Sequence, residues 1–557
     1  MTSAFAGIPG ALALTLLLAT SAVSQDVELD PNRAVETQSQ TPDATQADTE
    51  ETDAEAAAQA AAAADAAAPA TGQQTTPTAA RRSAPAGILV RDVVFSNASS
   101  YISVEELDRI EAGLVGRRYS AAGLGLIPQA INQAYAAQGI TTAQAILRSV
   151  RGGRAEVELL EARVGTVSAS PGIISDAYFR FRLGVPSGAL ADNRVLNARL
   201  DRVSLTDGLP LELAFSPGSA YGTTDVTVVQ PERKRHVTTI TLDNYGSVSS
   251  GEAQLSFAHS ILSLTGWNDP LTLTAQLREG ARGGSVAYAR TITPGGGFIN
   301  LSFGYTTTED VNGIPLTGRQ KTFDVAYTQP LIVEAARRAS VTVGFSAYEE
   351  TAKFAGFQTL GHNGKELSLG GSYYQAGEGW SFTISPRLIA GDYDDAVIPR
   401  TGISYTALQA NLYTSVAVGG DAVASISASG QKRVSGVLPS QRKFTVTSPS
   451  AVRGYPTSLS SGDSGYFVRT QIEKLTPYST GGNLGLRPFA FLDFGEAFDS
   501  TDTGLGFASS IGVGISFVAG QVTFGDIYIA KPLSTGIGGW ANPSKAAVVG
   551  ASLSIRF

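Results

Sequence analysis

The chain has 557 residues, a formal net charge of −8, no cysteine and three histidines, and only 16% of its residues are charged. This composition excludes disulfides and thiolate metal sites, and it leaves little material for a histidine-based catalytic or metal centre. The acidic segment 25–70 holds the excess negative charge, so the remainder carries no basic field for nucleic acid.

The amino-terminal part of the chain predicts no folded domain. Residues 1–24 contain an apolar run followed by the small residues Ala22 and Ser24, a pattern that indicates a secretory signal peptide without a preceding Lys or Arg. Residues 25–86 consist mainly of Ala, Gln, Thr, Asp, Glu and Pro, and we expect a disordered acidic linker. Within this linker, residues 54–68 have the composition of a helix.

Residues 87–163 predict a first α+β module with the element order β-α-α-β-β. Ser103 and Glu106 have the spacing of a capping box, which begins a helix that reaches Leu114. A second helix follows, with apolar residues at helical spacing on one face. The three predicted strands lie at residues 88–95, 143–149 and 155–160.

Residues 164–231 repeat this order less clearly and predict a second module of the same kind. Its last two strands are joined by a turn of Pro, Gly, Thr and Asp, residue types that favour a hairpin. The predicted elements are a helix at Asn193–Val203 and strands at Leu211–Phe215 and Thr224–Val229, and the hairpin contains Pro217, Gly218, Gly222, Thr223 and Asp225.

Residues 232–557 change to alternating segments separated by Gly, Asn, Asp and Pro. Leu301 and Phe303 share one face of such a segment, and Ser302 and Gly304 share the other. One apolar face and one small polar face are typical of a membrane β-barrel with lipid outside and water inside. No run here reaches the roughly 18 apolar residues of a membrane helix. At roughly 20 residues per strand and connection, about 16 antiparallel strands fit.

Two short motifs inside the predicted barrel carry opposite charges. The first is Val452-Arg453-Gly454-Tyr455, and the second contains Asp493, which the alternation places on the inner face of a strand. An arginine on a loop that folds into a polar lumen needs a carboxylate, because an unpaired charge away from bulk water is costly. Asp493 is a carboxylate that could serve as this partner of Arg453.

The two motifs occur in this order, inside a predicted barrel that follows two α+β modules. In this arrangement they resemble the paired signature of outer-membrane transporters with periplasmic POTRA domains. The chain is most similar to their two-partner secretion branch, the haemolysin/haemagglutinin activator (TpsB) family. This resemblance implies α+β POTRA domains followed by a transmembrane antiparallel β-barrel, with Arg453 at the tip of a loop inside the barrel, paired with Asp493. It also implies that the hairpin of the second module binds the client, and that the helix at residues 54–68 either plugs the barrel or belongs to the linker.

The resemblance further implies a function. Such transporters export one large exoprotein of the TpsA type, unfolded, from the periplasm through the barrel pore without ATP. The expected location is the outer membrane of a Gram-negative bacterium, with lipid around the barrel. Phe557 resembles the signal that the barrel assembly machinery reads. We expect no enzymatic activity, cofactor or metal.

Other functions remain open at this point. An insertase that folds other barrels would favour five POTRA domains, whereas this chain has room for two. A passive porin or surface adhesin would need no periplasmic domains. The tetrapeptide Gly462-Asp463-Ser464-Gly465 matches the surroundings of a chymotrypsin-like nucleophile, but no histidine has a matching context, so we interpret it as a structural turn.

Overall fold

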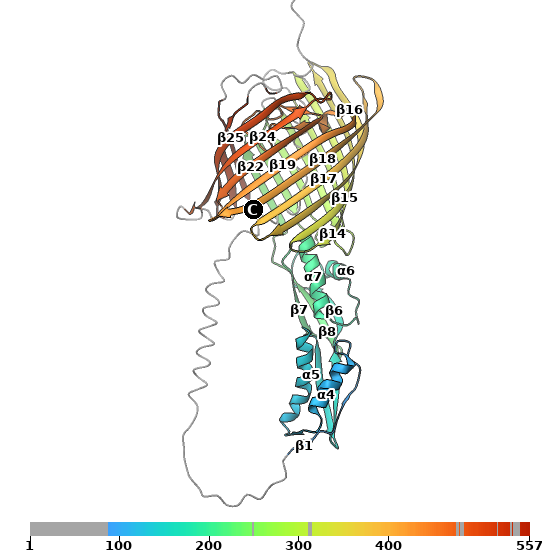
Figure 1. Cartoon of the computed structure of the whole chain (residues 1–557). Coiled ribbons are helices and arrows are strands. Elements are labelled where there is room, and N and C mark those ends of the chain that lie inside the picture. Colours follow the sequence, from blue (N-terminus) through green and yellow to red (C-terminus); the bar gives the residue numbers. More distant parts are fainter. Residues whose placement is uncertain are drawn as a thin grey trace, which may run out of the picture.

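The computed structural model describes residues 87–247, 250–309, 315–474, 478–479, 484–520, 522–534, 537 and 546–557. The predicted signal peptide, the linker and the helix at residues 54–68 lie outside the described residues. In the part that is described, two small α+β modules hang below a large barrel (Figure 1). Within those same ranges, no helix combines the length and the apolar character needed to cross a membrane.

The first module packs two helices on a small sheet. Ser103 caps α4, because its hydroxyl accepts a hydrogen bond from the amide of Glu106 at 3.3 Å. Ile127 and Ile131 of α5 are fully buried in the core. The sheet order is β2-β5-β4, with β2 parallel to β5. The elements are β1 (Ile88–Leu89), β2 (Asp92–Phe95), α4 (Val104–Leu114), β3 (Arg118–Tyr119), the 3-10 helix η1 (Gly123–Gly125), α5 (Leu126–Ala137), β4 (Ala143–Arg151) and β5 (Arg154–Glu161).

The strand predicted at residues 88–95 is in fact two strands. The amide of Val90 donates to the carbonyl oxygen of Arg117 at 3.0 Å, whereas the amide of Arg91 donates to Gly153 at 2.7 Å. The backbone therefore changes partner between these two residues, so that β1 pairs with β3 and β2 with β5. A run of apolar side chains cannot reveal such a change of backbone partner.

The second module has a sheet in the order β6-β8-β7 and two helices. Helix α7 lies where the sequence predicted a helix and is four residues longer. Helix α6 was not located, because Phe179, Phe181 and Leu183 alternate with arginines in the period of a strand. The elements are β6 (Arg163–Ala169), α6 (Asp176–Leu183), α7 (Asn193–Asp207), β7 (Glu212–Pro217) and β8 (Thr223–Val229).

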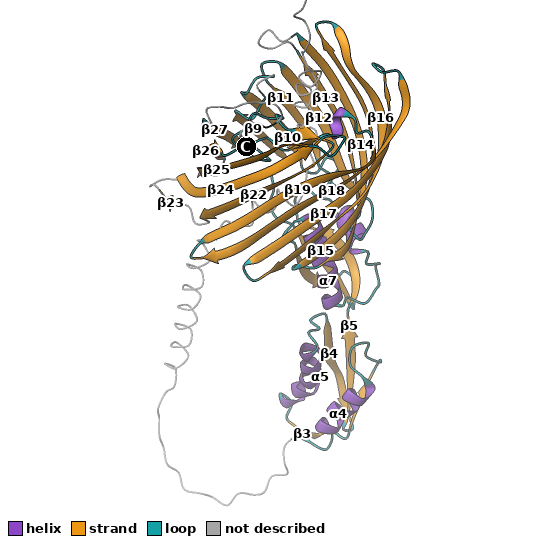
Figure 2. Ribbon diagram, turned by 45° about the horizontal axis from the view of Figure 1, so that its top comes forward, coloured by secondary structure: helices purple, strands orange, loops and turns teal. Residues whose placement is uncertain are grey.

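The rest of the described chain is a closed antiparallel barrel of 16 strands, in which β27 pairs with β9 (Figure 2). The predicted fold class is thereby confirmed. The two-residue strand β23 (Tyr478–Ser479) extends the pairing of β24. The barrel strands are β9 (His236–Asp243), β10 (Gln254–Ile261), β11 (Leu271–Leu277), β12 (Ala281–Thr291), β13 (Phe298–Thr308), β14 (Leu316–Val333), β15 (Arg337–Phe354), β16 (Phe357–Gly377), β17 (Trp380–Asp395), β18 (Arg400–Gly419), β19 (Ala422–Gly436), β22 (Ser464–Lys474), β24 (Leu484–Phe498), β25 (Gly504–Ala519), β26 (Thr523–Pro532) and β27 (Val548–Arg556).

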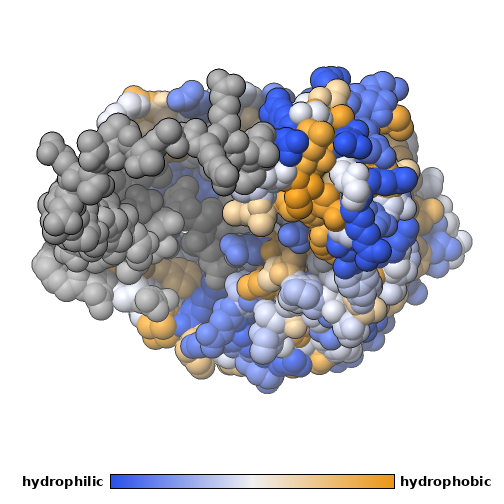
Figure 3. All heavy atoms as spheres, turned by 90° about the horizontal axis from the view of Figure 1, so that it is seen from below, coloured by the Kyte–Doolittle hydropathy of each residue, from blue (hydrophilic) through white to orange (hydrophobic). Residues whose placement is uncertain are grey.

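The two faces of the barrel wall differ in polarity. Leu301 and Phe303 face outward and are 39% and 48% exposed, as the surface of a protein in lipid requires. Strand β16 has 21 residues, about twice the roughly 9–11 that cross a bilayer, so part of the wall stands outside the hydrocarbon layer. Seen from below, hydrophilic residues surround a smaller hydrophobic area on the visible surface (Figure 3).

The segment between β19 and β22, residues 437–463, is the inner loop. It contains the 3-10 helix η2 (Ser440–Arg442) and the short strands β20 (Phe444–Thr445) and β21 (Ser461–Gly462), which pair with each other. Its side chains contact the inner face of the barrel at several places, so the loop folds back into the lumen.

Candidate functional site

The tip of the inner loop lies directly against the barrel wall. Val452 is fully buried, and its amide donates to the carbonyl oxygen of Val446 at 2.9 Å. Gly454 has a φ of +86°, and a Cβ there would lie 3.0 Å from the Cβ of Ala530 in β26. Glycine is required here because the backbone is left-handed and because the wall approaches so closely.

Tyr455 joins the tip to two further segments. Its hydroxyl donates to the carbonyl oxygen of Ser509 in β25 at 2.6 Å and accepts from the amide of Ser534 at 3.3 Å. The ring is buried among apolar side chains that include Phe444 and Val452. The tyrosine thus fixes the direction in which the preceding arginine points.

Arg453 and Asp493 form a buried, bidentate ion pair. The guanidinium donates from Nε to Oδ2 at 2.6 Å and from Nη2 to Oδ1 at 2.9 Å, and Nη1 donates to Oε1 of Gln471 at 3.1 Å. Arg453 is 3% exposed and Asp493 is 0% exposed. Removing either partner of such a pair leaves an isolated buried charge, which costs about 3–5 kcal/mol.

The guanidinium also rests on aromatic rings of the wall. The Cζ atom of Arg453 is 3.5 Å from the centre of the Phe491 ring and 5.8 Å from that of Tyr528. Phe489 packs beside Phe491, with 6.3 Å between the ring centres. A cation over an aromatic face is attracted to it, so the wall complements both the charge and the flat shape of the arginine.

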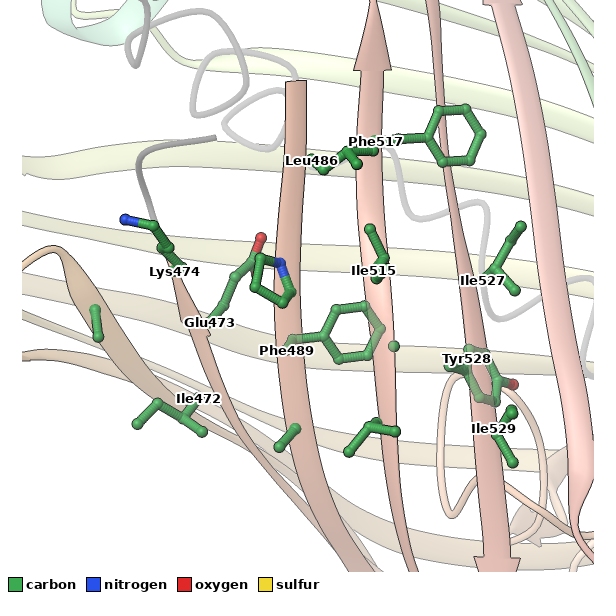
Figure 4. A pocket seen from close by; sticks show the side chains of 15 residues that line it. Ile472, Glu473, Lys474, Leu486, Phe489, Ile515, Phe517, Ile527, Tyr528 and Ile529 are labelled. Carbon is green, nitrogen blue, oxygen red and sulfur yellow. The ribbon is translucent and has the colours of Figure 1, made fainter. Parts of the chain in front are cut away.

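A hollow of about 820 Å³ opens in this part of the wall, and apolar side chains provide most of its lining. Figure 4 shows Phe489 and Tyr528 in its lining together with Ile515 and Ile529, which belong to the outer face. Among the described residues that line the hollow, Glu473 and Lys474 are charged and most of the others are apolar. We interpret it as part of the surface in contact with lipid.

The wall presents a second cation next to Asp493. Arg469 of β22 is its partner in the strand ladder, and Nη1 of Arg469 donates to the carbonyl oxygen of Ser450 in the inner loop at 3.0 Å. The carboxylate therefore has an arginine of the loop on one side and an arginine of the wall on the other.

The sequence did not predict that the root of the inner loop is anchored as well. Arg442 donates from Nε to the two carboxylate oxygens of Glu366 in β16, at 2.9 and 2.7 Å. Ser440 donates to Glu350 of β15 at 2.5 Å. Both glutamates are buried, at 3% and 1% exposure. The sequence could have shown only that these glutamates occupy inward positions of strands. It could not have shown which residues of the inner loop they bind.

The Gly-Asp-Ser-Gly tetrapeptide has a structural role. Asp463 is fully buried and pairs with Lys443 of the inner loop. The hydroxyl of Ser464 accepts a hydrogen bond from the amide of Arg433 at 3.1 Å. The nitrogen Nδ1 of His362 is 3.3 Å from the hydroxyl of Ser440, a different serine. The tetrapeptide therefore closes the inner loop onto β22.

The predicted client-binding hairpin joins β7 to β8. Pro217 pairs with Thr224, the amide of Gly218 donates to Thr223 at 2.9 Å, and Gly222 has a φ of +73°. Asp225 is held inside the module, because its carboxylate accepts from the amide of Thr166 at 2.7 Å. These residues shape the hairpin, and their contact with a client stays a prediction.

The exposed tip of this hairpin reaches the first module. The hydroxyl of Tyr221 donates to Glu158 of β5 at 2.9 Å, and the guanidinium of Arg148 lies 5.4 Å from its ring centre. Asn193 forms a second link, because its side chain accepts from the amide of Thr141 at 3.0 Å. The two modules therefore form a connected stalk.

The second module is also attached to the barrel. Trp267, in the turn between β10 and β11, packs edge-on against Tyr178 of α6 at 5.6 Å between the ring centres. The hydroxyl of Tyr178 donates to Asp207 at 2.5 Å, and burial raises its pKa well above the ordinary value, so the proton stays in place. Gly296 of the next turn approaches Thr206 of α7 closely.

Comparisons with known proteins agree with this geometry. Residues 222–517 match the model of the haemolysin secretion/activation protein family ShlB/FhaC/HecB. The outer membrane transporter CdiB of Escherichia coli is 23% identical over 232 residues, which is 41% of this chain and 38% of that protein. The heme/hemopexin transporter protein HuxB of Haemophilus influenzae is 25% identical over 178 residues, which is 31% of each chain. The alignments thus span about a third of these relatives.

Solved structures share the fold over a longer range. The structure of CdiB from Escherichia coli has a TM-score of 0.63 at 17% identity and covers 100% of both chains. CdiB from Acinetobacter baumannii has a TM-score of 0.58 at 15% identity, over 93% of this chain and 100% of the other. Because the family model covers more than half of the sequence, the protein belongs to the haemolysin secretion/activation family ShlB/FhaC/HecB.

Proposed function

We propose that this outer-membrane barrel exports one dedicated large exoprotein of the TpsA type, unfolded, by two-partner secretion. The POTRA modules lie on the periplasmic side, where the client first arrives. The observation that carries the proposal is the Arg453–Asp493 pair, which holds the tip of a loop inside the pore. Whether the inner loop is held against the wall or released from it would determine the width of the pore.

The modules have strand edges that suit an extended client. Strand β7 ends the sheet of the second module and β4 ends that of the first. An extended chain binds to such an edge through backbone hydrogen bonds, which make little demand on its sequence. The hairpin with Gly222 and Asp225 lies at the end of β7 and would help to receive the client.

The inner wall suits passage without strong binding. Neighbouring strands carry pairs of short hydroxyl side chains that satisfy each other, such as Thr241 with Ser554 at 2.8 Å and Thr274 with Ser285 at 2.7 Å. Groups that are already hydrogen-bonded compete weakly for the backbone of a sliding chain. Folding of the client outside the cell would make the motion directional without ATP.

Replacing Arg453 by Ala and Asp493 by Ala, in separate variants, tests the proposal. The variants are expressed together with a candidate TpsA-type exoprotein from the same genome, and the exoprotein in the medium is measured. We expect barrels at normal levels in the outer membrane and nearly abolished secretion. The control is Lys432→Ala, which breaks an exposed pair with Asp502 and should secrete normally. Full secretion by both test variants would refute the role of the pair.

The runner-up function is a barrel insertase, and a passive porin is less favoured. The BamA structure from Haemophilus ducreyi lacking POTRA domains 1–3 has a TM-score of 0.50 at 12% identity, which reflects the shared fold. A deletion strain distinguishes the three functions. Loss of one secreted protein supports export, loss of many outer-membrane barrels indicates an insertase, and reduced permeability to small solutes indicates a porin.

A further inference from the structure

Cationic side chains gather where the second module enters the barrel. The connection between β8 and β9 contains Arg233, Lys234 and Arg235, and Arg556 lies at the end of β27, paired with Thr239. Lys234 and Arg235 are exposed. Within the described ranges, none of these four cations forms an ion pair, although the connection also contains a glutamate. The connection therefore carries more positive than negative charge.

Two of these cations, Arg233 and Arg556, lie close to each other. Burial, and then the guanidinium of Arg556, lower the pKa of Arg233 below its ordinary value. Arg556 lies two residues along β27 from Ser554, whose hydroxyl meets Thr241 on the inner wall, so strand alternation points Arg556 toward the lumen. The outward part of the cluster therefore consists of the exposed Lys234 and Arg235.

Two imidazoles beside the cluster face out of the barrel. In β9, His236 is on the same face as the exposed Ile240, and in β10, His259 is on the same face as the exposed Phe257. The nitrogen Nδ1 of His236 lies 3.4 Å from Nε2 of His259, and the rings are stacked. A pair of imidazoles on the outer wall is a polar interruption of a surface that is otherwise apolar.

The position of this surface relative to the bilayer follows from the fold. Strand β9 begins directly after the periplasmic module, so its first residues lie at the periplasmic rim of the barrel. The amide of Thr238 donates to the backbone oxygen of Phe557 at 2.8 Å, and the end marked C lies in the lower part of the barrel, toward the modules (Figure 1). Ile555 and Phe557 are 42% and 55% exposed. Such a rim is the level at which lipid phosphates meet acyl chains.

We propose that this seam patch binds the phosphate of an anionic phospholipid of the periplasmic leaflet, with the acyl chains along Ile555 and Phe557. An acidic peptide would use the cations but not the outward apolar wall, so the combination favours lipid. The site does not depend on the proposed export function. The seam patch consists of Lys234, Arg235, His236 and His259.

The test uses the full-length protein in detergent micelles. Native mass spectrometry and thermal unfolding measure binding of phosphatidylglycerol, of zwitterionic phosphatidylcholine and of inorganic phosphate. The test variant is Lys234→Gln/Arg235→Gln/His236→Gln. The control Arg337→Gln removes a cation at another turn on the same rim, where it is already paired with Glu334 at 2.9 Å.

We expect the wild type and the control to retain phosphatidylglycerol in preference to phosphatidylcholine, and the triple variant to bind it at least about tenfold more weakly. Equal binding by the triple variant, or equal binding of phosphatidylcholine by the wild type, would overturn the proposal. So would an equal stabilisation by inorganic phosphate, because the acyl chains would then contribute nothing.

Two further variants keep the result interpretable. The double variant Lys234→Gln/Arg235→Gln changes only residues that precede the first barrel strand. It should also lose phosphatidylglycerol binding, and it replaces the triple variant if that protein does not fold. Arg453→Ala should bind phosphatidylglycerol as the wild type does, because Arg453 contacts the inner wall of the barrel and is not part of the seam patch. Lipid binding and export can therefore fail independently.

Discussion

Arg182 of the second POTRA module donates from Nε to the carbonyl oxygen of Pro294, 3.1 Å away in the turn between β12 and β13. Its side chain is fully buried, and Nη1 pairs with Asp207 at 2.5 Å. The module is thus fixed to the barrel by a buried, hydrogen-bonded charge as well as by the covalent connection.

Arg182→Ala should therefore loosen the stalk. The change leaves Asp207 unpaired in a buried site, at a cost of about 3–5 kcal/mol. The chain has no cysteine, so spin labels can be introduced at chosen positions in the module and the barrel, and their distances measured by pulsed electron paramagnetic resonance. We expect a broadened distance distribution. Arg180→Ala on the same helix removes an exposed pair with Asp176 and a hydrogen bond to Val167, both within the module, so it should leave the distribution narrow. An equally narrow distribution for Arg182→Ala would contradict the prediction.

Arg453→Lys should fail to restore the tip anchor although it keeps the charge. Lysine cannot form two parallel hydrogen bonds to Asp493, and it does not stack on Phe491 as a flat guanidinium does. We expect secretion well below that of the wild type and unstable single-channel currents in planar bilayers. Currents and secretion equal to those of the wild type would show that charge alone suffices.

Gly454→Ala tests the close approach of the loop to the wall. The added methyl group meets Ala530 at a backbone with a φ of +86°, a conformation that costs an L-residue about 1–3 kcal/mol. We expect reduced secretion with normal barrel levels. Gly402→Ala is the matched control, since its φ is +65° and no atom lies within 4 Å of the new Cβ. An equal loss in both variants would assign the effect to the backbone alone.

Glu366→Gln tests the root of the inner loop. Arg442 would lose its carboxylate partner while the tip pair remains, so the root should become mobile and the open-channel noise should rise. Glu349→Gln, which breaks an exposed pair with Lys321, should not change the currents. Combining Glu366→Gln with Asp493→Ala measures the coupling between the two anchors; strictly additive effects would mean that they act separately.

The sequence by itself determined the architecture and the central ion pair. Alternation of apolar and small polar residues has the period of a strand, so it predicts barrel strands and the inward position of Asp493 wherever one face meets lipid and the other water. The charge of Arg453 calls for a carboxylate if its loop lies inside the barrel, and the family resemblance of the two motifs supplied that position and the partner Asp493. Local patterns also located α4, α5 and α7, because capping and helical spacing are encoded within a few residues.

Only the tertiary structure decided which distant residues meet. The pairs Arg182–Asp207 and Arg442–Glu366 and the seam patch bring together residues from separate elements, and no local pattern in the chain records these encounters. Helix α6 was missed for a related reason: its alternating pattern is that of a strand, and packing against Trp267 and the core makes it helical. Side-chain periodicity reports which face is buried, whereas the identity of the partner depends on how the whole chain folds.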